Sequence, residues 1–188
     1  MNDIKILPNN IECENAVLGA CLLEGKAIYE IVDVLKPEMF YKEAHVTIFE
    51  CLVEMFKNGE QIDLLTAAQN LIKSGKFEII GGAVYLNSLT SHIVSSANIE
   101  YHSAIIKENY VKRNIIKFGH DLFAKAYENF EDLETLVNYI DQEIYTITND
   151  CFGKNNIEHI SIPIDKALKE TYDKQKNTQE GIPCGGLS

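Results

Sequence analysis

The feature that most constrains this chain is a long stretch without proline, from Asn98 to Asn149. Its first part, 98–129, contains one glycine and predicts a helix on the order of 45 Å long, more than one small core can cover. One apolar face, interrupted only by Glu108, recurs at helical spacing and consists of Tyr101, Ala104, Val111, Ile115, Phe118, Leu122 and Ala126.

A second helix is expected to begin at Asp132, a residue that favours the N-cap position. It carries one narrow apolar stripe of Leu133, Leu136, Val137, Ile140, Ile144 and Ile147. The connection 128–131 is short, which favours antiparallel neighbours. The pattern therefore predicts a helical hairpin over 98–149 whose two arms pack against each other through their apolar stripes.

The first arm carries more apolar surface than one neighbouring helix needs. Ile116, Phe123 and Tyr127 project from the flank of its main stripe and widen the apolar sector to about half the circumference. A second subunit or another partner would use this excess, and we expect one because the tip of the hairpin lies far from the remaining chain. The alternative is that the globular part of the same chain covers these residues.

Net charge and cysteine usage limit the classes of protein. With 28 acidic and 17 basic residues the formal charge is −11, a surface that repels phosphate backbones and disfavours direct binding of DNA or RNA. The five cysteines are scattered and odd in number, which fits reduced thiols in the cytosol better than disulfides or zinc. Without a signal-like start or a run of ~20 apolar residues, we expect a soluble, intracellular protein.

The rest of the chain also shows helical patterns, and strand signals are nearly absent. Helices are expected over 11–24, 27–35 and 42–57, then after the cap residue Asp63, and again after Gly81-Gly82. The expected buried faces are Val46, Phe49, Leu52, Val53 and Phe56 in the third helix, and Leu64, Leu65, Ala68, Leu71 and Ile72 in the fourth. The predicted class is all-α: a globular helical bundle with a protruding long antiparallel helical hairpin.

Residues 150–188 are expected to form a linker with one short helix at about 163–176. Pro163 suits a first helical turn, and Ile164, Leu168 and Tyr172 share one side of the helix. The segment 181–188 is rich in turn-forming residues, and we interpret it as the beginning of a further domain.

The sequence shows no pattern that predicts a catalytic, cofactor-binding or metal-binding site. The glycine pairs Gly81-Gly82 and Gly185-Gly186 lack the lysine of a phosphate-binding loop. The five histidines form no metal-binding pair, and His45, near an aromatic cluster, is interpreted as a structural side chain. We therefore expect no enzymatic activity from this chain alone.

Several segments in order resemble one family. The opening Ile11-Glu12-Cys13-Glu14-Asn15-Ala16-Val17-Leu18-Gly19 resembles the I-E-x-E-x-A-V-L-G of bacterial replicative DNA helicases, the DnaB family. The similarity continues through Phe40-Tyr41 with His45, Ile48 and Phe49, Ile62 to Thr66, Gly81-Gly82 with Tyr85-Leu86, Ser96 to Tyr101, and Arg113. Gly181-Ile182-Pro183 is similar to the turn that leads into the family's ATPase domain, although Cys184 replaces its threonine.

The resemblance implies a domain organisation and a function. It implies a globular subdomain at 1–97, a dimerisation hairpin at 98–149, and a linker at 150–188 that stops before a RecA-like motor. In that family the N-terminal domains form the collar of a hexameric ring, pair through their hairpins and recruit primase at the replication fork. The motor, which binds ATP and magnesium, pulls single-stranded DNA through the ring. No cofactor is implied for this fragment.

The apolar pattern of the hairpin and the family resemblance together predict which residues contact partners. Ile116, Phe123 and Tyr127, with Tyr139 of the second arm, are expected at the interface between subunits. By resemblance, the surface offered to the C-terminal domain of primase includes Glu12, Tyr85 and Leu122. As alternatives, Tyr85 and Leu122 are core side chains and Glu12 is a helix-start charge. The resemblance also implies that the linker helix docks on the motor of the adjacent subunit through Ile164, Leu168 and Tyr172.

Two other functions stay open at this point. One is a stand-alone helical adaptor or helicase-loader-type protein that uses the same domain. The other is a small helical enzyme whose site is assembled from residues distant in sequence. The resemblance also allows a helicase loader among the partners, and implies bacterial cytoplasm as the compartment.

Overall fold

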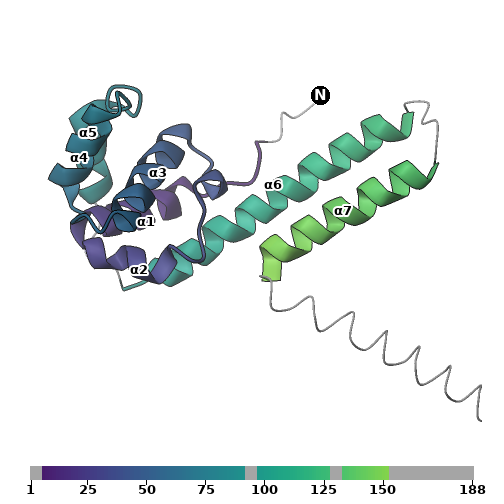
Figure 1. The fold of residues 1–188 in the computed structure, drawn as a ribbon, viewed down its shortest axis with the longest axis horizontal. Coiled ribbons are helices and arrows are strands. Elements are labelled where there is room, and N and C mark those ends of the chain that lie inside the picture. Colours follow the sequence, from purple (N-terminus) through teal and green to yellow (C-terminus); the bar gives the residue numbers. More distant parts are fainter. Residues whose placement is uncertain (1–5, 92–96, 128–132, 153–188) are drawn as a thin grey trace, which may run out of the picture. The chain divides into compact units, whose positions relative to one another are not determined.

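The computed structural model describes residues 6–91, 97–127 and 133–152, and all regular structure in these ranges is helical (Figure 1). The α-helices are α1 (Ile11–Leu23), α2 (Ile28–Ile31), α3 (Glu43–Lys57), α4 (Leu64–Lys73), α5 (Gly82–Ser91), α6 (Ile99–Tyr127) and α7 (Leu133–Phe152), and the 3-10 helices are η1 (Gly25–Ala27) and η2 (Pro37–Met39). The all-α class is thus confirmed. The chain divides into two compact units, Met1–Asn129 and Phe130–Ser188.

Helix α1 is the centre of the first unit. It contacts α3, α4, α5 and α6, and every residue from Val17 to Leu22 is buried. A helical segment that is buried on all sides needs an apolar sequence all round rather than one apolar stripe, and residues 17–22 of α1 have such a sequence. Its most deeply buried side chains are those of Val17, Leu18, Cys21 and Leu22.

Local capping signals fix where the helices begin. The Asn10 side chain accepts a hydrogen bond from the backbone N–H of Cys13 and caps α1. The Asp63 side chain accepts from Leu65 and Thr66, while the Thr66 hydroxyl accepts from the Asp63 backbone N–H, which completes a capping box. The cap that the sequence predicts at Asp63 is therefore present.

The inner half of α6 packs against the bundle, and its outer half extends beyond it (Figure 1). Ile99, Ser103 and Ile106 are buried, whereas the helix has no buried residue beyond Ile106. At 1.5 Å per residue a helix of 29 residues is roughly 43 Å long, so the bundle covers only part of it. The predicted long first arm is confirmed as a helix.

Three predicted packing faces are wrong in detail. Tyr101 was expected on the main stripe of α6, but it is 68% exposed because Ile99, Ser103 and Ile106 form the buried face. In α4, Leu65 and Ile72 are exposed, since the helix packs through Ala67 and Leu71 instead.

A similar rotation occurs in α3, where His45, Ile48 and Met55 are buried and Val46, Val53 and Phe56 are only half-buried. Phe49 and Leu52 of α3 and Leu71 of α4 are buried as predicted. Only the edge of each stripe was misplaced, because apolar residues lie on both sides of the true face.

Helix α7 begins at Leu133, directly after the predicted start of the second arm, and ends at Phe152, beyond the predicted end at 149. Its antiparallel packing against α6 stays a prediction, as does the division of the chain at 97/98. The predicted connection 128–131, the cap at Asp132 and the linker helix at 163–176 lie outside the described residues. None of the helices in the described ranges is both long enough and apolar enough to span a membrane.

Candidate interaction surfaces

The outer half of α6 presents large apolar side chains to solvent. Ile116 is 47% exposed, Phe123 65% and Tyr127 78%. The rings of Phe123 and Tyr127 are neighbours, with centroids 4.9 Å apart and a tilt of 54°. Residues seven and four positions apart on a helix lie on one side, so these three form one surface, which we call the outer α6 surface. All three are exposed, as the partner hypothesis requires.

Helix α7 carries its own exposed apolar stripe. Leu133, Val137 and Ile144 are exposed, and Ile140 between them is half-buried. Steps of four, three and four residues keep such side chains on a single narrow face. Tyr139, the predicted interface residue on this helix, is half-buried and lies on a different side from the stripe. Its place in an interface stays a prediction.

The three residues predicted to face primase differ in exposure. Glu12 is exposed in the first turn of α1, where its charge also complements the helix dipole. Leu122 is half-buried on α6. Tyr85 is half-buried on α5, and its hydroxyl takes part in a polar network that reaches the core.

This network joins α1, α3 and α5 through Glu14, His45 and Tyr85. His45 Nδ1 lies 2.6 Å from Glu14 Oε2, and His45 Nε2 lies 2.6 Å from the Tyr85 hydroxyl oxygen. Glu14 and His45 are both buried. The imidazole and phenol rings are stacked at 6.0 Å with an angle of 20°. The structural interpretation of His45 is therefore confirmed: both of its ring nitrogens have partners.

Further hydrogen bonds extend this network at both ends. Glu14 accepts from the backbone N–H of Tyr41 at 2.7 Å and from that of Lys42 at 3.4 Å, contacts that suit a carboxylate. The His45 ring bridges this carboxylate and the Tyr85 hydroxyl, with Nδ1 toward Glu14 and Nε2 toward Tyr85. The hydroxyl oxygen in turn accepts from Lys42 Nζ at 2.7 Å. In this hydrogen-bond network, which runs from Lys42 through Tyr85 and His45 to Glu14, each side chain has a hydrogen-bond partner.

Sequence reasoning missed the connection between these residues. Glu14 and His45 are 31 positions apart, and His45 and Tyr85 are 40 apart. Each was noticed singly, but only the fold brings their helices together. One sequence signal could have suggested a buried partner: Glu14 lies three and four positions before the apolar core residues Val17 and Leu18 and therefore shares their helix face.

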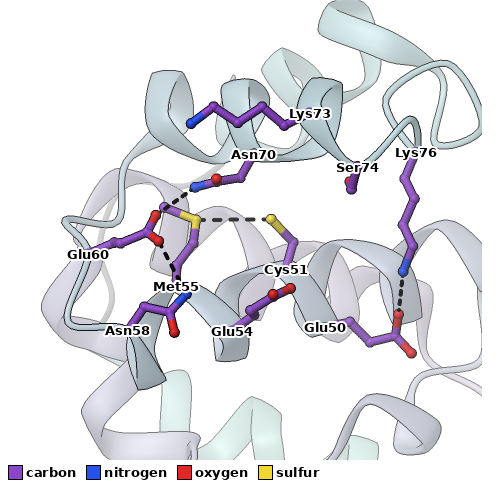
Figure 2. A pocket seen from close by; sticks show the side chains of 10 residues that line it. All are labelled: Glu50, Cys51, Glu54, Met55, Asn58, Glu60, Asn70, Lys73, Ser74 and Lys76. Carbon is purple, nitrogen blue, oxygen red and sulfur yellow. Dashed lines mark hydrogen bonds and ion pairs between the residues drawn. The ribbon is translucent and has the colours of Figure 1, made fainter.

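A cavity of about 460 Å³ lies between α3 and α4. Figure 2 shows Cys51 and Met55 of α3 at its wall, with Asn70 and Lys73 of α4 across from them. The Cys51 and Met55 sulfur atoms are 4.0 Å apart. Burial, the largest cause, raises the pKa of the Cys51 thiol to about 11, so it is a poor nucleophile at neutral pH.

The polar groups at the rim of this cavity already bind one another. Asn70 donates to Glu60 at 2.9 Å, and Lys76 contacts Glu50 at 3.0 Å (Figure 2). Within the described ranges, no group of three or more His, Cys, Asp or Glu side chains is arranged to hold a metal ion. We find no arrangement of an activated nucleophile and base at this cavity.

The predicted linker-docking residues Ile164, Leu168 and Tyr172 lie outside the described residues.

Comparison with known proteins identifies the family of this fold. Residues 6–108 match the model of the DnaB-like helicase N terminal domain, which is more than half of the chain. The chain therefore belongs to the family of DnaB-like helicase N-terminal domains, as the sequence resemblance indicated.

Individual relatives agree with this assignment. The chain is 32% identical over 187 residues to the replicative DNA helicase DnaB of Rhodothermus marinus, covering 96% of this chain and 19% of that protein. It is 33% identical over 183 residues to the replicative DNA helicase DnaB of Geobacillus stearothermophilus, covering 96% and 40%. The chain thus spans only a minor part of the length of these relatives.

Solved structures show the same fold. The crystal structure of the N-terminal domain of DnaB helicase from Mycobacterium tuberculosis has a TM-score of 0.71 and 31% identity, covering 75% of this chain and 99% of that one. A structure of a DnaB-like replicative helicase and its interactions with primase has a TM-score of 0.65 and 22% identity, covering 95% and 39%.

Proposed function

We propose that this chain is the collar part of a replicative DNA helicase, which pairs subunits within a hexamer and recruits primase to the replication fork. The observation that carries the proposal is the outer α6 surface, defined by Ile116, Phe123 and Tyr127, on a domain of the DnaB family. A large exposed apolar surface on a helix that extends beyond its own core is typical of an interaction site.

The energetics support pairing through several side chains rather than one. Burying one large apolar side chain contributes roughly 1.5–3 kcal/mol. Association costs an estimated ~4–15 kcal/mol in lost freedom of motion, so a single phenylalanine is not sufficient. In a symmetric pair both copies contribute Ile116, Phe123 and Tyr127, so six such side chains would be buried, and their summed contribution is of the same order as this cost. Tyr139 is proposed to contribute at the margin of the same interface.

In the proposed function, primase binds at a surface that includes Glu12, Tyr85 and Leu122. The support is family membership and the exposure of Glu12 and of part of Tyr85. The structure of a helicase with a similar fold was determined together with its interactions with primase, and we propose the same partner for this chain. The acidic charge of −11 fits a collar that contacts proteins rather than nucleic acid.

The whole helicase is proposed to use ATP and magnesium in a motor domain that is not among these residues. Ile164, Leu168 and Tyr172 are proposed to dock on the motor of the adjacent subunit. Reading the coding sequence beyond Ser188 tests this directly: a phosphate-binding loop of the form Gly-x-x-x-x-Gly-Lys-Ser/Thr about thirty residues on is expected. An open frame without one would favour the stand-alone adaptor.

Calorimetric titration tests the primase part of the proposal. The 188-residue chain is titrated with the C-terminal helical domain of the primase from the same organism, and saturable binding at micromolar concentration is expected. The absence of both heat and complex formation at these concentrations would refute primase recruitment by this chain.

A further inference from the structure

We propose that Glu14 and His45, although buried, are positioning residues that hold Tyr85 and Lys42 in the conformation that primase binds. This inference rests on the proposed function and adds two residues to it. Neither has direct access to a partner, because both side chains lie in the core. Their effect on binding would pass through the hydroxyl of Tyr85 and the backbone of residues 41 and 42.

The first step of the argument is the restriction of Tyr85. On an open helix surface a tyrosine samples several rotamers. Here its hydroxyl is held by His45 Nε2 at 2.6 Å and by Lys42 Nζ at 2.7 Å, and its ring is stacked on the imidazole. A side chain that is already ordered loses less conformational entropy when a partner binds, and this increases affinity.

The second step concerns Lys42, whose ammonium group lies 4.2 Å from the centroid of the Tyr85 ring. The side chain is exposed, and Glu14 accepts hydrogen bonds from the backbone N–H groups of Tyr41 and Lys42. One buried carboxylate therefore fixes both members of a Lys–Tyr pair, of which Lys42 is exposed and Tyr85 half-buried: the backbone of Lys42 directly, and the ring of Tyr85 through His45.

The third step separates this network from ordinary core packing. In the described part of the chain, the buried polar or charged residues are Glu14, His45 and Ser103. The Ser103 hydroxyl donates only to Glu100 in its own helix. Glu14 and His45 instead form a continuous hydrogen-bonded path from the core to half-buried Tyr85 and exposed Lys42. A buried ionisable pair adds little stability over an apolar one of the same volume, so a role in specificity is the more economical explanation.

A double-mutant cycle tests the coupling. His45→Asn keeps a side-chain amide near the Nδ1 position and removes the group that holds the Tyr85 hydroxyl; Tyr85→Phe removes the hydroxyl itself. We expect each substitution to weaken primase binding about tenfold, the loss of roughly one hydrogen bond. Because both break the same contact, the double variant should bind no more weakly than either single variant. Losses that multiply, or affinities equal to wild type, would overturn the inference.

Two matched variants separate positioning from a general effect on the fold. His45→Gln places an amide near the Nε2 position, so it should restore most of the affinity that His45→Asn loses. Ser103→Ala removes the other buried polar side chain and should leave affinity unchanged. If Ser103→Ala weakens binding as much as His45→Asn does, the effect is a general one and the inference fails.

A spectroscopic measurement on the free chain supplies an independent test. In a long-range ¹H–¹⁵N spectrum of His45, Tyr85→Phe should shift the Nε2 resonance more than the Nδ1 resonance, because the Tyr85 hydroxyl contacts Nε2. Should His45→Asn fail to fold, Tyr85→Phe decides: an unchanged primase affinity or an unchanged Nε2 resonance overturns the proposal. Failure of the wild-type chain to bind primase would refute the proposed function and this inference together, whereas binding with multiplied losses would refute the inference alone.

Discussion

The Nη2 atom of Arg113 on α6 donates a hydrogen bond to the carbonyl oxygen of Met39 at 2.6 Å, across 74 positions of sequence. Its Nη1 atom donates to the Pro8 carbonyl at 3.0 Å. One guanidinium therefore ties α6 to the segment before α1 and to η2. Partial burial, the largest cause, lowers the pKa of Arg113, but a guanidinium stays charged at any pH the protein meets.

Removing this guanidinium should destabilise the first unit. Arg113→Leu leaves two carbonyl oxygens without their charged donor, at a cost of about 1–3 kcal/mol in the free energy of unfolding measured with urea. Arg113→Lys should recover part of the loss, since an ammonium group reaches one carbonyl more easily than two. The control is Lys112→Ala on the same helix, which removes only the exposed pair with Glu108 and should cost about 0.5 kcal/mol or less. Equal losses for Arg113→Leu and Lys112→Ala would contradict the anchoring role.

The capping box at Asp63 supports a second prediction. Asp63→Ala should lower the free energy of unfolding by about 0.5–2 kcal/mol, and Asp63→Asn should lose much less because an amide oxygen also caps helices.

The cap also makes stability depend on pH. The backbone hydrogen bond from Thr66, the largest cause, lowers the pKa of Asp63 in the folded chain. Its contribution is therefore fully present above the unfolded pKa of about 3.9 and is lost as pH falls through the lower folded value. Urea titrations of wild type and Asp63→Asn should converge at acid pH. A difference that grows there would show that the carboxylate is not the stabilising form.

The cysteines give a chemical test of burial. Desolvation is the main cause that raises the pKa of Cys21 to about 12 and that of Cys51 to about 11. Because the thiolate is the reactive species, iodoacetamide at neutral pH should modify Cys21 only when the chain unfolds. Mass spectrometry of the peptides, with and without urea, gives the rates. Equal labelling of Cys21 in both conditions would mean that α1 is not in the core.

Self-association should depend on the outer α6 surface. Phe123→Asp places a charge among the apolar side chains that are proposed to contact a second copy. The variant should therefore dissociate at a higher protein concentration than the wild type, and its helicity should not change. The matched control is Ile72→Asp on α4, because Ile72 is 58% exposed and Phe123 65%. Sedimentation of both variants gives the comparison. If Ile72→Asp weakens association and Phe123→Asp does not, the interface lies elsewhere.

Elements defined by local signals were predictable from sequence. The bounds of α1, α3, α6 and α7 depend on apolar periodicity, and the start of α4 depends on the cap at Asp63. These signals lie within a few residues of their effect. The same holds for the exposure of Phe123 and Tyr127, because an arm this long has more apolar surface than a small bundle can cover.

Side-chain partners across the fold were not predictable. The contact of His45 with Glu14 and Tyr85 depends on how three helices cross, which a periodic pattern does not specify. Tyr101 shows a related limit: its spacing suits the main stripe of α6, yet a neighbouring face with Ile99 and Ile106 is the one the bundle covers. Periodicity finds an apolar face, but the choice between two adjacent faces is made by tertiary packing.

The mass of the particle in solution tests the central claim most directly. Multi-angle light scattering of the 188-residue chain, without nucleotide, compares the measured mass with that of one chain, 21.2 kDa. The account predicts a dimer or a larger assembly that dissociates on dilution, because Ile116, Phe123 and Tyr127 would be buried between copies. A strict monomer at high micromolar concentration would contradict it.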